Sequence, residues 1–131
     1  MKISHLQPQG VTKPAGAWTS VVVVENPGKL AFLSGFIARD EKGEILGVGD
    51  IRAQTRRVCE LLQTTVRAAG GELKDLVRVD VFVRDIDQFA AIHEVRREFF
   101  PEKAPASTMV EVSRMVDERA LIEINAIAVI P

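Results

Sequence analysis

The chain is 131 residues long, the size of one domain, because two separate cores of half that length would seldom fold unaided. Hydrophobic residues make up 47% and charged residues 27%, which is the balance of a globular protein and excludes a disordered one. Seventeen Lys and Arg against eighteen Asp and Glu leave a net charge of −1, so no basic field attracts nucleic acid or anionic lipid. We therefore expect a single domain, residues 1–131, without a nucleic-acid partner.

Local features favour a cytoplasmic protein with no metal or cofactor. The longest apolar runs, residues 21–24 and 126–130, are far shorter than the ~20 residues that cross a bilayer, and no secretory-type segment follows Lys2. Cys59 has no second cysteine for a disulfide, and one cysteine with two histidines does not make an ordinary zinc site. The sequence also lacks a phosphate loop, HExxH, GxSxG and CxxC. We expect no membrane partner, no metal and no cofactor.

Two strands open the predicted fold. Residues 19–24 and 30–34 are rich in strand-forming side chains, and the turn formers of residues 25–28 separate them as in a hairpin. We predict that these two strands are neighbours in one sheet.

A helix follows between Asp50 and Gly70. Its apolar residues recur at helical spacing, with charged and polar residues on the other side. Asp50 is a suitable N-cap, and Gly70 with Gly71 supplies a left-handed stop. The inward positions are Ile51, Val58, Leu61, Leu62, Val66 and Ala69.

A strand and a second helix come next. Valines at every second position from Val77 to Val83 predict a strand with one buried face. The second helix starts at residues 85–87, reaches Phe99 or Phe100, and ends at Pro101. We expect its inward residues to be Phe89, Ile92 and Phe99, and its outward residues to be Ala91, Glu94 and Glu98.

Two more strands, at about residues 106–113 and 121–129, close the chain. In the last one, apolar residues occupy both alternating sets, with Glu123 and Asn125 in the second set, so neither face is wholly polar. The order of elements predicts an α+β fold, in which a mixed sheet carries two helices on one face. The other face is left for a partner subunit.

Several segments of the chain have a characteristic sequence. They are residues 14–18 (PAGAW), 32–35 (FLSG), 49–55 (GDIRAQT), 81–83 (VFV), 89–95 (FAAIHEV), 105–112 (PASTMVEV) and 122–128 (IEINAIA). Together they resemble the reactive-intermediate deaminase (Rid) family of imine and enamine deaminases, over nearly the whole chain. The resemblance implies a chorismate-mutase-like fold assembled as a homotrimer, with small-molecule clefts between subunits.

The resemblance also implies a division of roles within the site. Family deaminases position the hydrolytic water with a glutamate that matches Glu123. The arginine that binds the substrate carboxylate is replaced by Ser107, which precedes Thr108. A serine offers one uncharged hydroxyl in place of a two-pronged cation, so we expect weak activity on simple 2-imino acids. Trp18 stands for the family's usual tyrosine, and His93 for its usual asparagine.

The roles of His93 and Glu123 have alternatives. His93 and Ser107 are the parts of an acyl-transfer site, with Glu123 to orient the imidazole, although nothing in the sequence shows that they meet. His93 otherwise hydrogen-bonds a neighbour at the edge of the inward helix face. Glu123, in an apolar strand, needs either a function or an ion pair with Arg114 or Arg119.

Arg96 and Trp18 also have two interpretations each. Helical geometry turns Arg96 inward, where it either restores an anion site from a different direction or lays its stem on apolar surface with its head at a subunit boundary. Trp18 is either a core or interface aromatic or the wall of a pocket.

The leading hypothesis is a small-molecule hydrolase or deaminase-like enzyme that acts on an imine, enamine or amide other than a simple 2-imino acid. Glu123 is its water-orienting base, Ser107 is the second catalytic candidate, and the substrate-binding candidates are Trp18, Ser34, Gly35, His93, Arg96 and Thr108. The alternative is a non-catalytic trimeric module that binds a metabolite. Ribonuclease or translation-inhibitor activity has support only from family names, because the chain lacks a basic stripe with interleaved aromatics.

Overall fold

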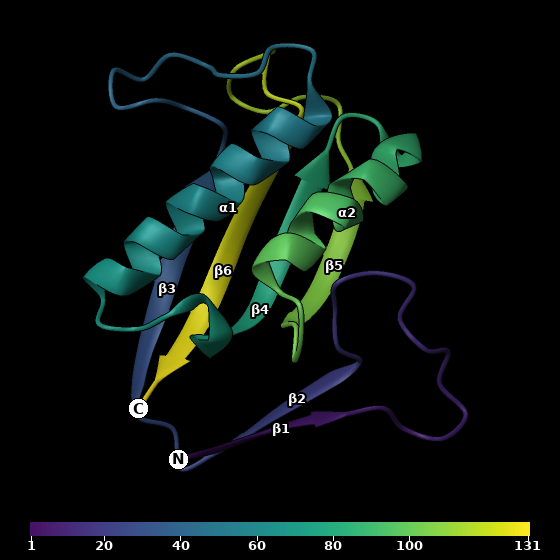
Figure 1. Cartoon of the computed structure of the whole chain (residues 1–131), viewed down its shortest axis with the longest axis vertical. Helices are drawn as coiled ribbons and strands as arrows, with labels where there is room; N and C mark the ends of the chain where they lie inside the picture. Colours follow the sequence, from purple (N-terminus) through teal and green to yellow (C-terminus); the bar gives the residue numbers. More distant parts are fainter.

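The structure, a computed structural model, describes all of residues 1–131 and consists of a mixed sheet with both helices on one face (Figure 1). Helix α1 (Ile51–Ala68) and helix α2 (Phe89–Phe99) lie side by side across that face. The predicted α+β architecture is confirmed. Neither helix is long and apolar enough to cross a membrane.

The main sheet has four strands. Their order is β3 (Lys29–Phe36), β6 (Ile122–Ile130), β4 (Leu76–Val83) and β5 (Ala106–Glu111). Strands β4 and β5 are parallel, and the other two pairings are antiparallel. The two strands predicted at the end of the chain are present, although β5 ends at Glu111 rather than Ser113 and β6 extends to Ile130. Strand β6 is bonded on both sides and forms the centre of the fold.

The predicted hairpin between residues 19–24 and 30–34 is wrong. Strand β2 (Val21–Glu25) pairs instead with an unpredicted strand, β1 (Lys2–Leu6), in a separate two-stranded sheet. The chain turns away at Asn26, which has a φ of +51°. Gly28 then passes so close to the carbonyl oxygen of Ile130 that a side chain there would overlap it. The turn at residues 25–28 therefore places β3 beside β6 and not beside β2.

The core lies between the sheet and the helices. Asp50 caps α1 by accepting a hydrogen bond from the Ala53 N–H (3.0 Å), and Gly70 follows the helix with a φ of +92°, as the sequence predicts. A β-bulge at the start of β4 places Leu76 in the core and leaves Val77 half-exposed, contrary to the simple alternation. The innermost residues are Val58, Leu62 and Val66 of α1, Val79, Val81 and Val83 of β4, Ile92 of α2, and Ile122, Ile124 and Ala128 of β6.

Helix α2 has a wider buried face than its sequence predicts. Ile92 is fully buried as expected, but Ala91, expected to face outward, packs against the core. Arg96 is buried, as helical geometry predicts, and His93 is buried as well, each with 1% of its surface exposed. The extra burial arises because α2 has α1 on one side and the N-terminal segment, through Ala17, on the other.

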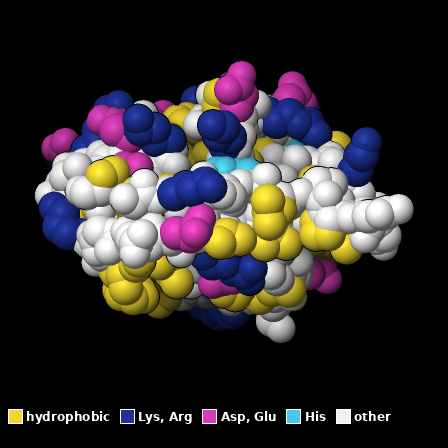
Figure 2. Space-filling model, turned by 90° about the horizontal axis from the view of Figure 1, so that it is seen from below, with side chains coloured by type: hydrophobic (Ala, Val, Ile, Leu, Met, Phe, Trp, Pro, Cys, Tyr) yellow, Lys and Arg dark blue, Asp and Glu magenta, His cyan; other side chains and the backbone are white.

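The sheet face without helices is apolar at its edge. Leu30 and Phe32 of β3 leave 58% and 74% of their surface exposed. Figure 2 shows hydrophobic side chains gathered along the lower side of the view, away from the charged side chains that crowd its upper side. Near the centre of this face, Arg78 contacts both Asp80 (2.9 Å) and Thr108 (2.6 Å). This open face is suited to cover by another protein surface.

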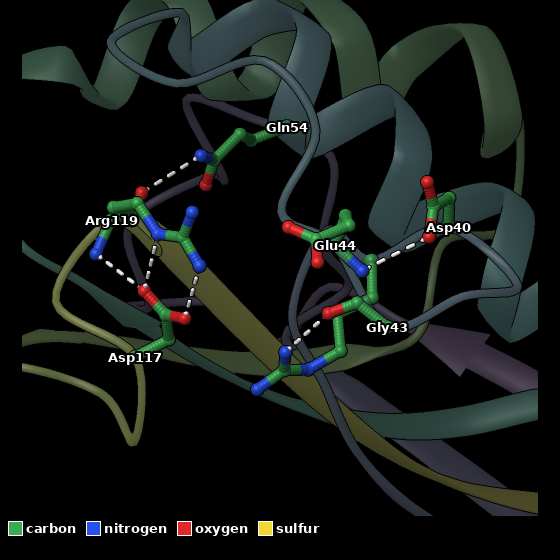
Figure 3. Close-up of polar contacts among 7 residues, drawn as sticks. Asp40, Gly43, Glu44, Gln54, Asp117 and Arg119 are labelled. Carbon is green, nitrogen blue, oxygen red and sulfur yellow. Dashed lines mark hydrogen bonds and ion pairs between the residues drawn. The ribbon is translucent and has the colours of Figure 1, made fainter.

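A buried glutamine anchors the loop of residues 112–121 to α1 (Figure 3). The Gln54 side chain donates to the carbonyl of Arg119 (2.9 Å) and accepts from the N–H of Leu121 (2.8 Å). Within the loop, Asp117 accepts hydrogen bonds from the main chain and the guanidinium of Arg119. A neighbouring loop is tied by Asp40, which accepts from the Glu44 N–H (3.0 Å). Both loops shape the surroundings of Glu123, described below.

We expect Gln54→Ala to lower the free energy of unfolding by about 1–3 kcal/mol, because it leaves a main-chain carbonyl and a main-chain amide without their partner. Urea unfolding measures the loss, and trypsin should cut residues 112–121 faster in the variant. The matched control is Gln63→Ala, because Gln63 is a half-exposed glutamine of the same helix. Equal stability and equal cleavage in the two variants would contradict the anchoring role.

Candidate functional site

The segment around Gly16 lies across α2 and is bound to it by two buried polar side chains. The N–H of Ala17 donates to Nδ1 of His93 (3.0 Å), and Nη2 of Arg96 donates to the Ala17 carbonyl (3.1 Å). Gly16 comes so close to the imidazole that a Cβ would collide with it. This contact sets the position of the next residue, Trp18.

Trp18 forms an aromatic cluster with two residues of α2. Its ring centroid lies 5.9 Å from that of Phe89 and 5.2 Å from that of His93, and Phe89 and His93 are 4.3 Å apart. With Ser107 and Met109 of β5, these rings line a pocket of about 210 Å³. The structure thus brings together three of the candidate residues, Trp18, His93 and Ser107, and places Trp18 in a pocket wall.

Arg96 stands behind this pocket. Its Nη2 donates to the Ser107 hydroxyl oxygen (3.2 Å), and its Nη1 is buried without a hydrogen-bond partner. Burial lowers the pKa of Arg96 to about 10, which still leaves the guanidinium charged at neutral pH. The guanidinium is enclosed by its own chain, with 1% of the residue's surface exposed. Whether its head lies at a subunit boundary stays a prediction.

His93 is a buried histidine that accepts a hydrogen bond from the Ala17 N–H. Burial, with a smaller contribution from the charges of Arg96 and Arg97, lowers its pKa to about 3. Because Nδ1 accepts from Ala17, the proton of the neutral ring is on Nε2. A histidine with this pKa is a poor general base at neutral pH. The hydrogen-bonded reading of His93 therefore fits better than the catalytic one.

Glu123 lies on the open face of β6 beside a bulge in β3. The bulge falls between Leu33 and Phe36 and holds two candidates, Ser34 and Gly35. A side chain at Gly35 would overlap the Glu123 carboxylate in its present position, so glycine permits the close approach. Ser34 is exposed at the same bulge.

Neither arginine considered as an ion-pair partner holds Glu123. Arg119 pairs with Asp117 (2.8 Å), and Arg114 donates to the carbonyl of Met115 (3.3 Å). The half-buried carboxylate instead opens to two hollows. The first, of about 200 Å³, is lined by Phe82, Val112, Arg114, Met115 and Glu123. The second, of about 310 Å³, is lined by Gly35, Phe36, Ile37, Arg39, Asp40, Leu61, Val116 and Glu123.

The candidate residues divide between the two faces of the sheet. Ser107 is paired with Val79, whose side chain is in the core, so Ser107 faces the helices. Glu123 is paired with Phe82 on the opposite face. Thr108 shares the face of Glu123, and its hydroxyl accepts from Arg78. A single chain therefore does not form the acyl-transfer arrangement of His93, Ser107 and Glu123.

Several lining residues were absent from the sequence-based candidates. The sequence predicts Phe89 as a core residue, and its position four residues before His93 places both side chains on one helix face. Met109 lies two residues after Ser107 and hence on the same face of β5. Arg39 comes from a loop, and no sequence periodicity points to its place near Glu123. Arg114 was considered only as an ion-pair partner of Glu123, and it lines the first hollow without forming that pair.

Comparison with known proteins identifies the family of this chain. The family model described as endoribonuclease L-PSP matches residues 10–130. The chain belongs to this family. A RutC family protein of Pyrococcus horikoshii is 40% identical over 92% of both chains. The 3-aminoacrylate deaminase RutC of Acinetobacter baylyi is 36% identical over 92% of this chain and 93% of its own.

The structural comparison agrees with the sequence comparison. A Rid family protein of unknown function from Yersinia pestis superposes with a TM-score of 0.89. It is 25% identical, and the match covers 99% of this chain and 100% of that one. The family and the fold predicted from the sequence are thus confirmed.

The low pKa of His93 predicts a pH-dependent stability. Below about pH 6.5 the unfolded chain protonates this histidine, while the folded chain keeps it neutral down to about pH 3. Its contribution to stability is therefore complete above pH 6.5 and is lost progressively as the pH falls. We expect the difference in melting temperature between the wild type and His93→Gln to shrink from pH 7 to pH 4. A difference that stays constant, or that matches His5→Gln, would contradict this assignment.

Proposed function

We propose that this protein is a Rid-type hydrolase in which Glu123 activates water for attack on the carbon of a C–N bond. The observation that carries the proposal is the state of the Glu123 carboxylate, which is half-buried, opens to two hollows and is bound to neither Arg114 nor Arg119. A carboxylate in an otherwise apolar strand without an ion-pair partner is free to accept a proton.

The chemistry follows from general-base catalysis on an imine. The carboxylate takes one proton from water while the water oxygen bonds to the imine carbon, and it passes this proton to the imine nitrogen, which gives a neutral carbinolamine. In the second step the carboxylate takes the proton of the carbinolamine hydroxyl and delivers it to the amino nitrogen, so that the C–N bond breaks, ammonia leaves and a carbonyl compound remains. An enamine enters the same sequence after protonation at carbon converts it to the imine.

Two observations support the choice of substrate. The Acinetobacter baylyi relative is a 3-aminoacrylate deaminase, which makes an enamine the first substrate class to test. Ser107 stands where the resemblance requires an arginine for short 2-imino acids, so we assign the activity to an imine, enamine or amide other than these.

We further propose that the working site lies between subunits of a homotrimer. Within one chain the Ser107 pocket and Glu123 are on opposite faces of the sheet, so a second copy is needed to bring them to one cleft. The exposed Leu30 and Phe32 offer apolar surface for that contact. The same proposal places the enzyme in the cytoplasm, where a single free cysteine such as Cys59 is ordinary.

The second candidate function is a non-catalytic module that binds a metabolite. It is favoured by the pocket at Trp18, which contains no general base because His93 has a pKa of about 3. Ribonuclease activity has support only from the family description and ranks last.

The catalytic role of Glu123 is tested by Glu123→Gln. We expect turnover of an enamine generated in situ, measured as ammonia release, to fall by about 10²–10⁴-fold because the amide cannot accept the proton. The melting temperature should change little, since the near-isosteric amide breaks no ion pair. Glu41→Gln, in an exposed loop, is the control. Unchanged turnover with a large fall in melting temperature would make Glu123 structural and favour the binding module.

The intersubunit site is tested by mixed assemblies. Light scattering should report three times 14.4 kDa for the wild type, and Phe32→Glu should lower that mass by placing a charge in the apolar contact. Glu123→Gln and Ser107→Phe, which fills the pocket, should each be inactive alone. Co-expressed, they should regain part of the activity, because some clefts then combine an intact pocket with an intact Glu123. A monomeric mass, or inactive mixed trimers, would refute the shared site.

A further inference from the structure

A further hollow, here called the terminal hollow, lies at the end of the molecule where the two chain ends come together (Figure 1). Its volume is about 300 Å³, and none of its lining residues borders the pocket at Trp18 or the hollows at Glu123. It is formed by strand β1, the 3₁₀ turn Leu73–Asp75, the loop between α2 and β5, and the chain ends Met1 and Pro131. Its size falls at the lower end of the range of about 300–1,000 Å³ that is typical of small-molecule sites.

The side chains that line the terminal hollow carry an excess of positive charge. Lys74 and Lys103 both line it, and neither takes part in an ion pair. Asp75 is the one side-chain carboxylate of the lining, and its Oδ2 already accepts from the Glu72 N–H (2.7 Å). The two chain ends add one charge of each sign. The lining therefore keeps one positive charge that no anion balances.

His5 adds a hydrogen-bond donor to the same hollow. Partial burial and, to a smaller extent, the charge of Lys103 lower the pKa of this histidine. The ring is therefore neutral at pH 7 and carries one N–H. Two ammonium groups and an imidazole N–H together suit a ligand whose oxygens are negatively charged.

Lys103 has a backbone conformation that is rare for a residue with a side chain, with a φ of +50°. The two residues that follow it are buried and bound to Thr19, whose hydroxyl donates to the Ala104 carbonyl and whose N–H donates to the Pro105 carbonyl (3.1 Å). These bonds hold the strained segment in place. Strain of this kind is concentrated at ligand sites, where it fixes the direction of a side chain.

We propose that the terminal hollow binds a small phosphate monoester, with Lys74 and Lys103 contacting the phosphate and His5 donating a further hydrogen bond. Two compact ammonium groups suit a tetrahedral dianion, whereas a carboxylate matches the planar fork of an arginine better. Ile3 supplies an apolar wall for the organic part of the ester. Asp75 favours an ester that carries a hydroxyl group, because its second oxygen can accept from one.

The site is tested by an NMR titration of the isotope-labelled, untagged chain at constant ionic strength. The probes are glycerol phosphate, inorganic phosphate, acetate and glycerol. We expect glycerol phosphate to shift the amide signal of Lys103 and the ring signals of His5, one of two histidines, and to bind at least about 10-fold more tightly than acetate. Inorganic phosphate should bind more weakly than the ester, and glycerol should not bind.

Three results of this titration would overturn the proposal. Shifts confined to residues outside the terminal hollow would remove the site. Equal affinity for acetate would remove the preference for phosphate. Tighter binding of inorganic phosphate than of glycerol phosphate would replace the ester by the free ion.

A matched pair of lysine variants assigns the charge. Lys103→Gln should weaken the binding of glycerol phosphate by about 10-fold, because it removes one of the two ammonium groups. Lys42→Gln removes the same charge from an exposed loop that lines no hollow, and it should have little effect. Equal losses would show that the charge of the whole chain attracts the ester, and would overturn the proposal.

Asp75→Asn gives a test of the opposite sign. The amide oxygen can still accept from the Glu72 N–H, and loss of the negative charge should strengthen the binding of inorganic phosphate by about threefold or more. Unchanged or weaker binding would contradict the assigned electrostatics. If this variant does not fold, Lys74→Gln replaces it, with an expected loss like that of Lys103→Gln. A Lys74→Gln protein that binds as the wild type does would overturn the two-lysine site.

Discussion

The alternation of side chains across the sheet is the constraint on which the rest of the structure depends. Strand β6 is bonded on both sides, so a shift of one residue would bring Glu123 and Asn125 into the core and put Ile122 and Ile124 outside. Burial of the apolar residues of β6 therefore fixes its register. This register places Glu123 on the open face of the sheet. The same rule applied to β5 turns Ser107 toward the helices.

The pocket is built on a second constraint, the contact between the N-terminal segment and α2. Two polar side chains of α2, His93 and Arg96, are buried, and Ala17 satisfies one polar atom of each. Gly16 permits the close approach, and Trp18 then completes the aromatic wall. Part of the buried face of α2 is therefore polar. His93 and Arg96 bind the N-terminal segment there, beside the pocket that Trp18 and Ser107 help to line.

Each side of the main sheet has one charged residue without an ion-pair partner, and the two residues have opposite charges. Arg96 is fully buried behind the helix-side pocket, and Glu123 is half-buried on the open side. Neither has an ion-pair partner among its neighbours, which is unusual for charged groups removed from water.

The sequence by itself determined the elements that depend on local periodicity. Helix α1 with its Asp50 cap, the valine alternation of β4 from Val79 to Val83 and the two-faced pattern of β6 all follow from residues close together in the chain. The resemblance of several segments to a known family predicted the overall fold. Only the tertiary structure decided that β2 pairs with β1, that His93 is a neutral acceptor, and that Arg96 stands behind Ser107. These facts depend on which distant segment supplies a partner or removes water, and no local spacing encodes either.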